Sequence, residues 1–106
     1  MQKFFKKIGD SYEDYEINYR IHATRRMFQR NIDNSDVEKV IKEGAIIEQY
    51  EDDLPFPSFL ISGKTNHGEP LHVVASLNIN ERILYVITVY YPDPIKWVDE
   101  YSRREK

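Results

Sequence analysis

The sequence predicts an α+β fold in which two N-terminal helices pack on one face of a twisted, mainly antiparallel sheet of four to five strands. Three observations support this fold class. One alternating segment is followed by two stretches of helix-forming residues, and the chain after Gly44 is rich in β-branched and aromatic residues. Short turn-forming connections separate the later segments, which favours antiparallel neighbours.

The first strand is predicted from an alternation of apolar and polar residues, because a half-buried strand has a period of two. Its apolar positions are Tyr15, Ile17, Tyr19 and Ile21. A short helix is then predicted from Ala23 to Arg30, where good helix formers predominate and the apolar Ala23 and Met27 stand one turn apart.

The second helix is predicted to begin at a capping box formed by Ser35 and Glu38. Its apolar stripe consists of Val37, Val40 and Ile41. Gly44 stands where such a helix would end, and we expect it to adopt the left-handed conformation that is common at helix C-termini.

Four strands are predicted after Gly44, at Ala45 to Tyr50, Ser58 to Lys64, Leu71 to Asn78 and Ile83 to Tyr90. The connections between them are rich in Asp, Asn, Pro and Gly, which suit turns. Consecutive strands with such short connections predict an antiparallel meander.

The whole chain, 1–106, is predicted to be a single domain. Its core spans 15–97, after a loosely packed arm at 1–14 and before a tail at 98–106. We expect Trp97 to act as a hydrophobic plug that folds the tail back on the body.

Composition excludes several classes of protein. The absence of cysteine excludes disulfides, thiol nucleophiles and thiolate zinc sites. No apolar run approaches the roughly 20 residues that cross a bilayer, and Met1 to Gly9 lacks the apolar stretch of a secretory signal. We therefore expect a cytoplasmic protein without a membrane partner.

Positive charge is concentrated in one segment of a chain whose formal net charge is -3. Residues 17–32 contain no acid and carry His22 and four arginines, namely Arg20, Arg25, Arg26 and Arg30. His22, Arg26 and Arg30 lie four residues apart, which places them along one side of a helix. Guanidinium groups match phosphate oxygens, and a histidine can move a proton near neutral pH. The alternative is structural: the arginines pair with surface carboxylates, and His22 caps the helix.

A second group of candidate residues lies on the last two long strands. His72 alternates with uniformly apolar neighbours, so its side chain points away from the main core. If the register pairs even with even positions, His72, Thr88 and Tyr90 line one polar surface, whereas a slip of one residue separates them. The structural alternatives are a partly buried histidine bonded to backbone and an amphipathic edge tyrosine.

No metal or cofactor is predicted. The three histidines, His22, His67 and His72, show no compact ligand spacing, and His67 lies in an Asn-His-Gly turn. A glycine-rich phosphate loop and a nucleophile elbow are also absent.

Several motifs recur in the order seen in a known family. They are His22-Ala23-x-x-Arg26-Met27-x-x-Arg30-x-Ile32, Asp36-Val37, Gly44-x-Ile46-Ile47-Glu48, Pro70-Leu71-His72-Val73-Val74, Tyr85-Val86-Ile87-Thr88-Val89-Tyr90, Pro92-Asp93-Pro94 and Trp97. This pattern resembles the bacterial and archaeal domain of unknown function 4258, from about Tyr19 to Trp97. The resemblance marks His22, Arg26, Arg30, His72 and Tyr90 as site residues.

The resemblance implies a RelE-like fold and a MqsR-like toxin of a type II toxin-antitoxin pair. Such a toxin is an mRNA-cleaving ribonuclease, and its partner is a small antitoxin, often with an MqsA-type zinc finger.

The corresponding hypothesis is a metal-independent endoribonuclease. His22 or His72 would take the proton of the ribose 2′-hydroxyl, Arg26 and Arg30 would stabilise the charge on phosphorus, and the other histidine or Tyr90 would protonate the leaving oxygen. The residues expected to contact the substrate are Arg20, Arg25, Lys64 and Thr88. The alternative is a non-catalytic module that binds RNA or a partner protein through the same basic helix. The oligomeric state stays open.

Overall fold

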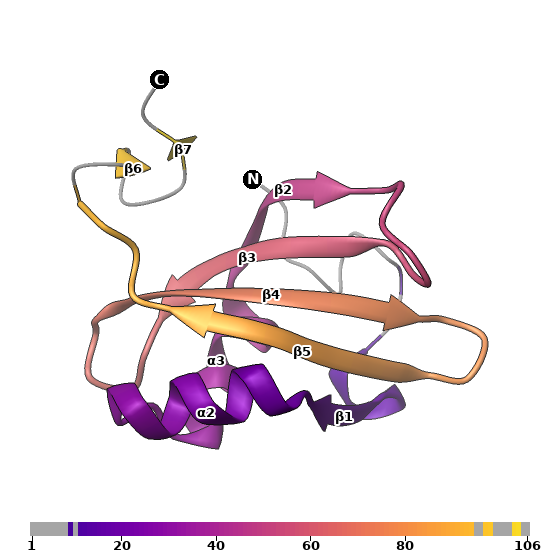
Figure 1. Ribbon diagram of the computed structural model, residues 1–106, viewed down its shortest axis with the longest axis horizontal. Helices are drawn as coiled ribbons and strands as arrows, with labels where there is room; N and C mark the ends of the chain where they lie inside the picture. The colour runs from indigo at the N-terminus through magenta and orange to yellow at the C-terminus, as the bar shows by residue number, and fades with distance from the viewer. Residues whose placement is uncertain (1–8, 10, 95–96, 99–102, 105–106) are drawn as a thin grey trace.

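A computed structural model describes residues 9, 11–94, 97–98 and 103–104 of the chain. The described residues form an α+β fold with two α-helices and a five-stranded mixed sheet (Figure 1). The elements in chain order are η1 (Tyr12–Asp14), β1 (Glu16–Tyr19), α2 (Ile21–Arg30), α3 (Asn34–Glu43), β2 (Ala45–Tyr50), β3 (Ser58–Lys64), β4 (Pro70–Asn78), β5 (Ile83–Tyr90), β6 (Trp97–Val98) and β7 (Arg103–Arg104).

The sheet has the strand order β1-β5-β4-β3-β2. Strands β2 to β5 form the predicted antiparallel meander, and their bounds agree with the predicted segments except that β4 begins one residue earlier, at Pro70. Strand β1 pairs with β5 in parallel, so the chain must cross from one to the other through both helices and the rest of the sheet. This parallel pair makes the sheet mixed.

The first strand is shorter than its alternation predicted. It ends at Tyr19, and Ile21 begins α2 with its side chain 70% exposed. Arg20 lies between them in extended conformation, and its backbone N–H donates to the Val86 carbonyl at 3.0 Å. This bond continues the parallel pairing with β5 for one residue before the chain turns into the helix.

Helix α2 buries Ala23 and Met27, as their spacing predicted. It ends at Arg30, and its C-cap, Asn31, is left-handed with φ 59°. An asparagine tolerates this conformation better than most residues, because its short side chain bonds locally. The next backbone N–H, that of Ile32, donates to the Met27 carbonyl at 2.9 Å and brings the buried Ile32 under the helix.

Two predicted details of α3 are wrong. The capping box uses Asp33 and Asp36 rather than Ser35 and Glu38, and the Asp33 backbone N–H donates to Asp36 Oδ2 at 3.1 Å. Gly44 is not left-handed, since its φ is -74°. Glycine is needed there for space: a Cβ would lie 2.5 Å from the Val40 carbonyl oxygen and 2.7 Å from that of Ser62.

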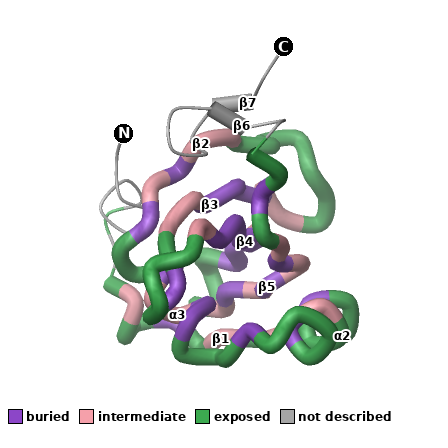
Figure 2. The backbone as a smooth tube through the Cα atoms, turned by 90° about the vertical axis from the view of Figure 1, so that its left-hand side faces the viewer, coloured by how far each residue is buried: buried purple, intermediate pink, exposed green. Residues whose placement is uncertain are grey.

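The two helices pack against different strands and lie on different sides of the sheet in Figure 2. Helix α2 packs against β5, and α3 packs against β3 and β4. One buried apolar cluster joins both helices to the sheet and includes Ala23, Met27, Val37, Val40, Ile41, Ile61, Val73, Val86 and Val89. The face of the sheet turned away from α3, which we call the far face, presents the side chains of β3, β4 and β5 that alternate with those of the cluster.

Part of the predicted N-terminal arm is ordered against the core. Residues Tyr12–Asp14 form η1, and the Tyr12 ring packs on the apolar cluster with Lys42 Nζ 4.7 Å from its centroid. Residues 1–8 of the arm and the side chain of the predicted plug Trp97 lie outside the described residues. No helix among the described residues is long and apolar enough to span a membrane.

Candidate functional site

The far face carries the residues that β4 and β5 were predicted to share. The register pairs His72 with Tyr90 and Val74 with Thr88, so even positions do face even positions at this end of the hairpin. The Nδ1 atom of His72 and the hydroxyl of Tyr90 are joined by a hydrogen bond of 3.2 Å, and the two rings meet edge to face at 5.2 Å between centroids. The structure thus brings His72 and Tyr90 together, with Thr88 beside them on β5.

His72 is not on a polar surface, because its side chain is 0% exposed. Tyr90 and Thr88 are half-buried and remain partly accessible. A group with no exposed surface cannot touch a bound substrate without rearrangement, whereas the Tyr90 hydroxyl can. His72 is therefore placed to orient and polarise Tyr90 rather than to react itself.

A bulge in β5 adds a residue to the far face that simple alternation does not place there. The register shifts between Val74 and Ala75, so that Ala75 pairs with Val86 and Ser76 with Tyr85. The extra residue, Ile87, leaves the odd-numbered Tyr85 on the same face as the even-numbered Tyr90. Sequence reasoning missed Tyr85 because no residue in this run of β-branched and aromatic side chains marks a bulge.

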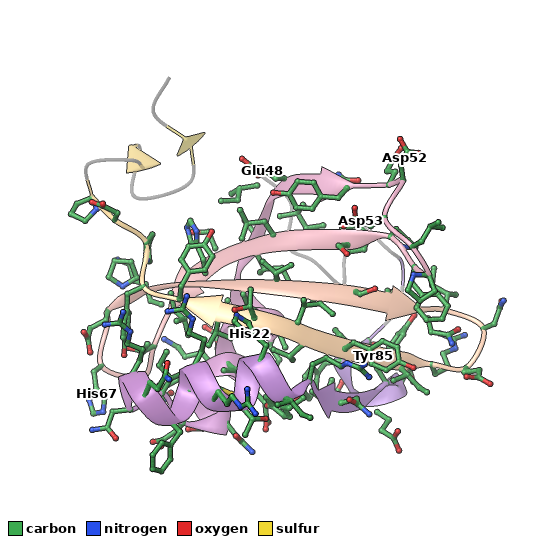
Figure 3. All side chains as sticks on the ribbon, viewed as in Figure 1. His22, Glu48, Asp52, Asp53, His67 and Tyr85 are labelled. Atoms are coloured by element: carbon green, nitrogen blue, oxygen red, sulfur yellow. The ribbon has the colours of Figure 1, made fainter. Side chains whose placement is uncertain are left out.

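The basic residues of α2 form one stripe, made of His22, Arg26 and Arg30. His22 and Arg30 are exposed and Arg26 is half-buried. The opposite flank of the helix, at Thr24 and Phe28, borders a hollow of about 480 Å³ that also touches the start of α3. The stripe therefore lies on the flank turned away from α3, along β5, where Figure 3 shows His22.

The alternative, in which the arginines pair with surface carboxylates and His22 caps the helix, finds no support in the described part of the chain. Arg25, Arg26 and Arg30 form no ion pair or side-chain hydrogen bond with any described residue. His22 does not cap α2, because the N-cap is Arg20 and it makes no side-chain capping bond. Among the described residues, no acid occupies the guanidinium groups of the stripe.

Arg20 and the aromatic rings of the far face form a second feature. The Arg20 guanidinium lies 5.6 Å from the centroid of the Tyr85 ring, and Phe56 stacks on Tyr85 with centroids 5.9 Å apart and planes inclined by 8°. A hollow of about 210 Å³ opens among them, lined by Arg20, Pro55, Phe56, Ser76, Tyr85 and Ile87. The charge pattern of the sequence marks Arg20 as a candidate, but no pattern marks Phe56 and Tyr85 as its neighbours.

Lys64 and Arg25 stand apart from these contacts. Lys64 is exposed at the end of β3, opposite Pro70 in the β3–β4 hairpin. Arg25 is exposed on α2 between the two flanks. No group of three or more histidine, cysteine or acidic residues gathers in the described ranges in a way that suits a metal ion.

The family comparison agrees with the resemblance read from the motifs. The family model described as "Domain of unknown function (DUF4258)" matches residues 19–91. This match covers more than half of the chain, so the protein belongs to that family. No curated protein and no solved structure matches the chain.

Proposed function

We propose that this protein is a metal-independent endoribonuclease, the toxin of a type II toxin-antitoxin pair, which binds the RNA backbone along α2. The observation that carries the proposal is the stripe of His22, Arg26 and Arg30. Its guanidinium groups lack partners among the described residues, and it runs beside the strand that presents the Tyr90 hydroxyl. Arginines in such a row bind phosphates in bidentate geometry.

The proposed reaction uses the groups of the site that are exposed or half-buried. His22 takes the proton of a ribose 2′-hydroxyl, and the oxygen attacks the adjacent phosphorus while Arg26 and Arg30 stabilise the added negative charge. The bond from phosphorus to the 5′-oxygen breaks, and the Tyr90 hydroxyl supplies that oxygen's proton. His72, bonded to Tyr90, holds the hydroxyl in place. The products are a 2′,3′-cyclic phosphate and a 5′-hydroxyl.

Cleavage of a labelled RNA by the purified protein tests the chemistry. We expect products with 2′,3′-cyclic phosphate ends, no inhibition by a chelator, and no cleavage where a 2′-deoxynucleotide replaces the attacking ribose. General acid and base groups are each worth roughly 10²- to 10⁴-fold, so Tyr90→Phe should lower the rate by about that factor. Chelator-sensitive cleavage, or full activity in Tyr90→Phe, would refute this mechanism.

Growth of a bacterial host on induced expression tests the biological role. We expect arrest with fragmented RNA for the wild type, and normal growth for the double variant Arg26→Ala, Tyr90→Phe. Tyr90→Phe is preferred to a His72 variant because deletion of a fully buried ring leaves a cavity that destabilises the fold. Arg25→Ala is the matched charge control on the same helix, and it should weaken arrest less than Arg26→Ala.

The burial of His72 favours a second candidate, a module that binds RNA or a partner protein without turnover. Because His72 is inaccessible, the groups that remain for acid-base chemistry are the exposed imidazole of His22 and the hydroxyl of Tyr90. Saturable RNA binding with no product after prolonged incubation would favour this candidate. In either case an antitoxin, with an MqsA-type zinc finger as the family resemblance implies, would neutralise the protein by covering the α2 stripe.

A further inference from the structure

We infer that the hollow beside Arg20 is a subsite for an unpaired nucleobase, which stacks on the aromatic platform formed by Phe56 and Tyr85. This inference rests on the proposed function, because it assigns a base-binding site to the same RNA strand. The platform and the α2 stripe are joined by Arg20, which lines the hollow and is the N-cap of α2.

Hydrogen bonds connect the platform to β4. Phe56 belongs to the β2–β3 loop, and two hydrogen bonds tie that loop to β4: the Ser76 hydroxyl donates to the Phe56 carbonyl at 3.4 Å, and the Leu77 N–H donates to the Pro57 carbonyl at 3.3 Å. The near-parallel rings of Phe56 and Tyr85 are both half-buried, so part of each remains accessible. A preformed aromatic surface binds a flat ligand at little cost in conformational entropy.

The lining of the hollow suits a base that belongs to a polyanion. Aromatic faces stack on any nucleobase, and a guanidinium adds a cation that attracts the attached phosphate. A volume of about 210 Å³ accommodates one such ring system but no folded element. An apolar ligand would make no use of Arg20, which is exposed at the rim.

The position of the hollow fits a strand that also reaches the proposed reaction site. Tyr85 and Tyr90 lie on the far face of the same strand, and because of the bulge their β4 partners, Ser76 and His72, are only four residues apart, which is about 13 Å. That separation is too long for one nucleotide, so the stacked base and the cleaved phosphate belong to different nucleotides of one RNA. Base stacking at Tyr85 would then set where along the strand the cut is made.

Binding of uncleavable oligonucleotides separates this inference from catalysis. The probes are a short fluorescein-labelled 2′-O-methyl oligouridylate and an abasic oligomer with the same backbone; the methyl group blocks attack, so only binding is measured. We expect the wild type to prefer the oligouridylate by about 5- to 150-fold, the range for one stacked base. Tyr85→Ala and Phe56→Ala should each abolish this preference without weakening abasic binding.

Two control variants sharpen the experiment. Tyr85→Phe keeps the ring and should keep the preference, and Leu54→Ala changes a 91% exposed residue of the same loop that does not line the hollow. If Tyr85→Ala does not fold, Phe56→Ala decides the result. Equal binding of both probes by the wild type overturns the base subsite while the proposed phosphate binding stands. Failure to bind either probe overturns both proposals.

Discussion

At the scale of single residues, the surroundings of each polar group decide which role it can take. His72 and His22 are the same residue type, yet one is fully buried against Tyr90 and the other is exposed on α2. Tyr90 and Tyr19 are both half-buried but differ in the partner of the hydroxyl. The Tyr90 hydroxyl is bonded to His72, whereas the buried Tyr19 hydroxyl has no hydrogen-bond partner among the described residues.

Tyr19→Phe should stabilise the protein or leave its stability unchanged. An unpaired buried hydroxyl costs roughly 1 to 3 kcal/mol of desolvation, and phenylalanine removes that cost while keeping the ring. We expect the free energy of unfolding in urea at neutral pH to rise by about 1 kcal/mol. A clear loss of stability would show that the hydroxyl has a favourable partner in solution.

The same variant has a testable effect at high pH. Burial, followed by the charge of Glu38, raises the pKa of Tyr19 from 10.0 to about 12. The neutral phenol is therefore favoured in the folded state, and this contribution to stability is complete below pH 10 and is lost as the pH rises towards 12. Tyr19→Phe should lose less stability over that interval than the wild type.

At the scale of elements, hydrogen bonds to one side chain tie α3 to a turn of the sheet. Asp36, in the first turn of α3, accepts hydrogen bonds from the Asn66 backbone N–H at 2.8 Å and from the Asn66 side-chain amide at 3.0 Å. Its other oxygen caps α3 through the Asp33 N–H. One carboxylate thus fixes the start of a helix to the β3–β4 turn, 30 residues later in the chain.

Asp36→Asn should destabilise the protein by about 1 to 2 kcal/mol, because an amide presents only one acceptor to these donors. Burial alone would raise the pKa of Asp36, but the bonds from the Asn66 and Asp33 N–H groups and the Asn66 side chain outweigh it and lower the pKa. The stabilisation is therefore present above the ordinary value of 3.8 and is lost as the pH falls below it. Urea unfolding between neutral and acidic pH should show this loss in the wild type and a flatter profile in the variant.

Gly44→Ala tests the contact between α3 and β3. The added methyl group would lie 2.5 Å and 2.7 Å from two backbone oxygens, which cannot move without shifting the helix or the strand. We expect a loss of about 1 to 3 kcal/mol in the free energy of unfolding, typical of an overpacked site. Gly68→Ala, in the open β3–β4 turn with φ 82°, is a useful comparison because its cost comes from the backbone conformation alone.

At the scale of the whole molecule, a net charge of -3 coexists with one basic stripe. The acidic residues elsewhere repel RNA, so binding must depend on α2 and should be sensitive to salt. For a single strand, the logarithm of the binding constant falls with the logarithm of salt concentration by about 0.7 per phosphate neutralised. Three phosphates held by Arg20, Arg26 and Arg30 predict a slope of about -2.

Arg26→Ala should reduce the magnitude of that slope by about 0.7 and weaken binding of all RNA sequences alike. Fluorescence anisotropy with the 2′-O-methyl oligouridylate over a series of salt concentrations measures both quantities. A slope unchanged by the substitution would mean that Arg26 does not contact the backbone.

The sequence by itself determined the elements and the residues of the basic stripe. Hydrophobic period and turn residues identified all four strands of the meander, and the four-residue spacing aligned His22, Arg26 and Arg30 on one helix. Both signals are local, because they depend on the pitch of a helix or the pleat of a strand. The tertiary structure decided the remaining features of the fold and the site, because those features depend on which distant segments meet.

Only the tertiary structure decided four features. They are the parallel pairing of β1 with β5, the burial of His72, the bulge that turns Tyr85 to the far face, and the stacking of Phe56 on Tyr85. Each joins residues far apart in the chain or depends on what covers a side chain. Periodicity within one segment carries no information about either. Gly44 makes a related point, since a Cβ there would meet the Ser62 carbonyl of a neighbouring strand as well as the Val40 carbonyl of the helix that it ends.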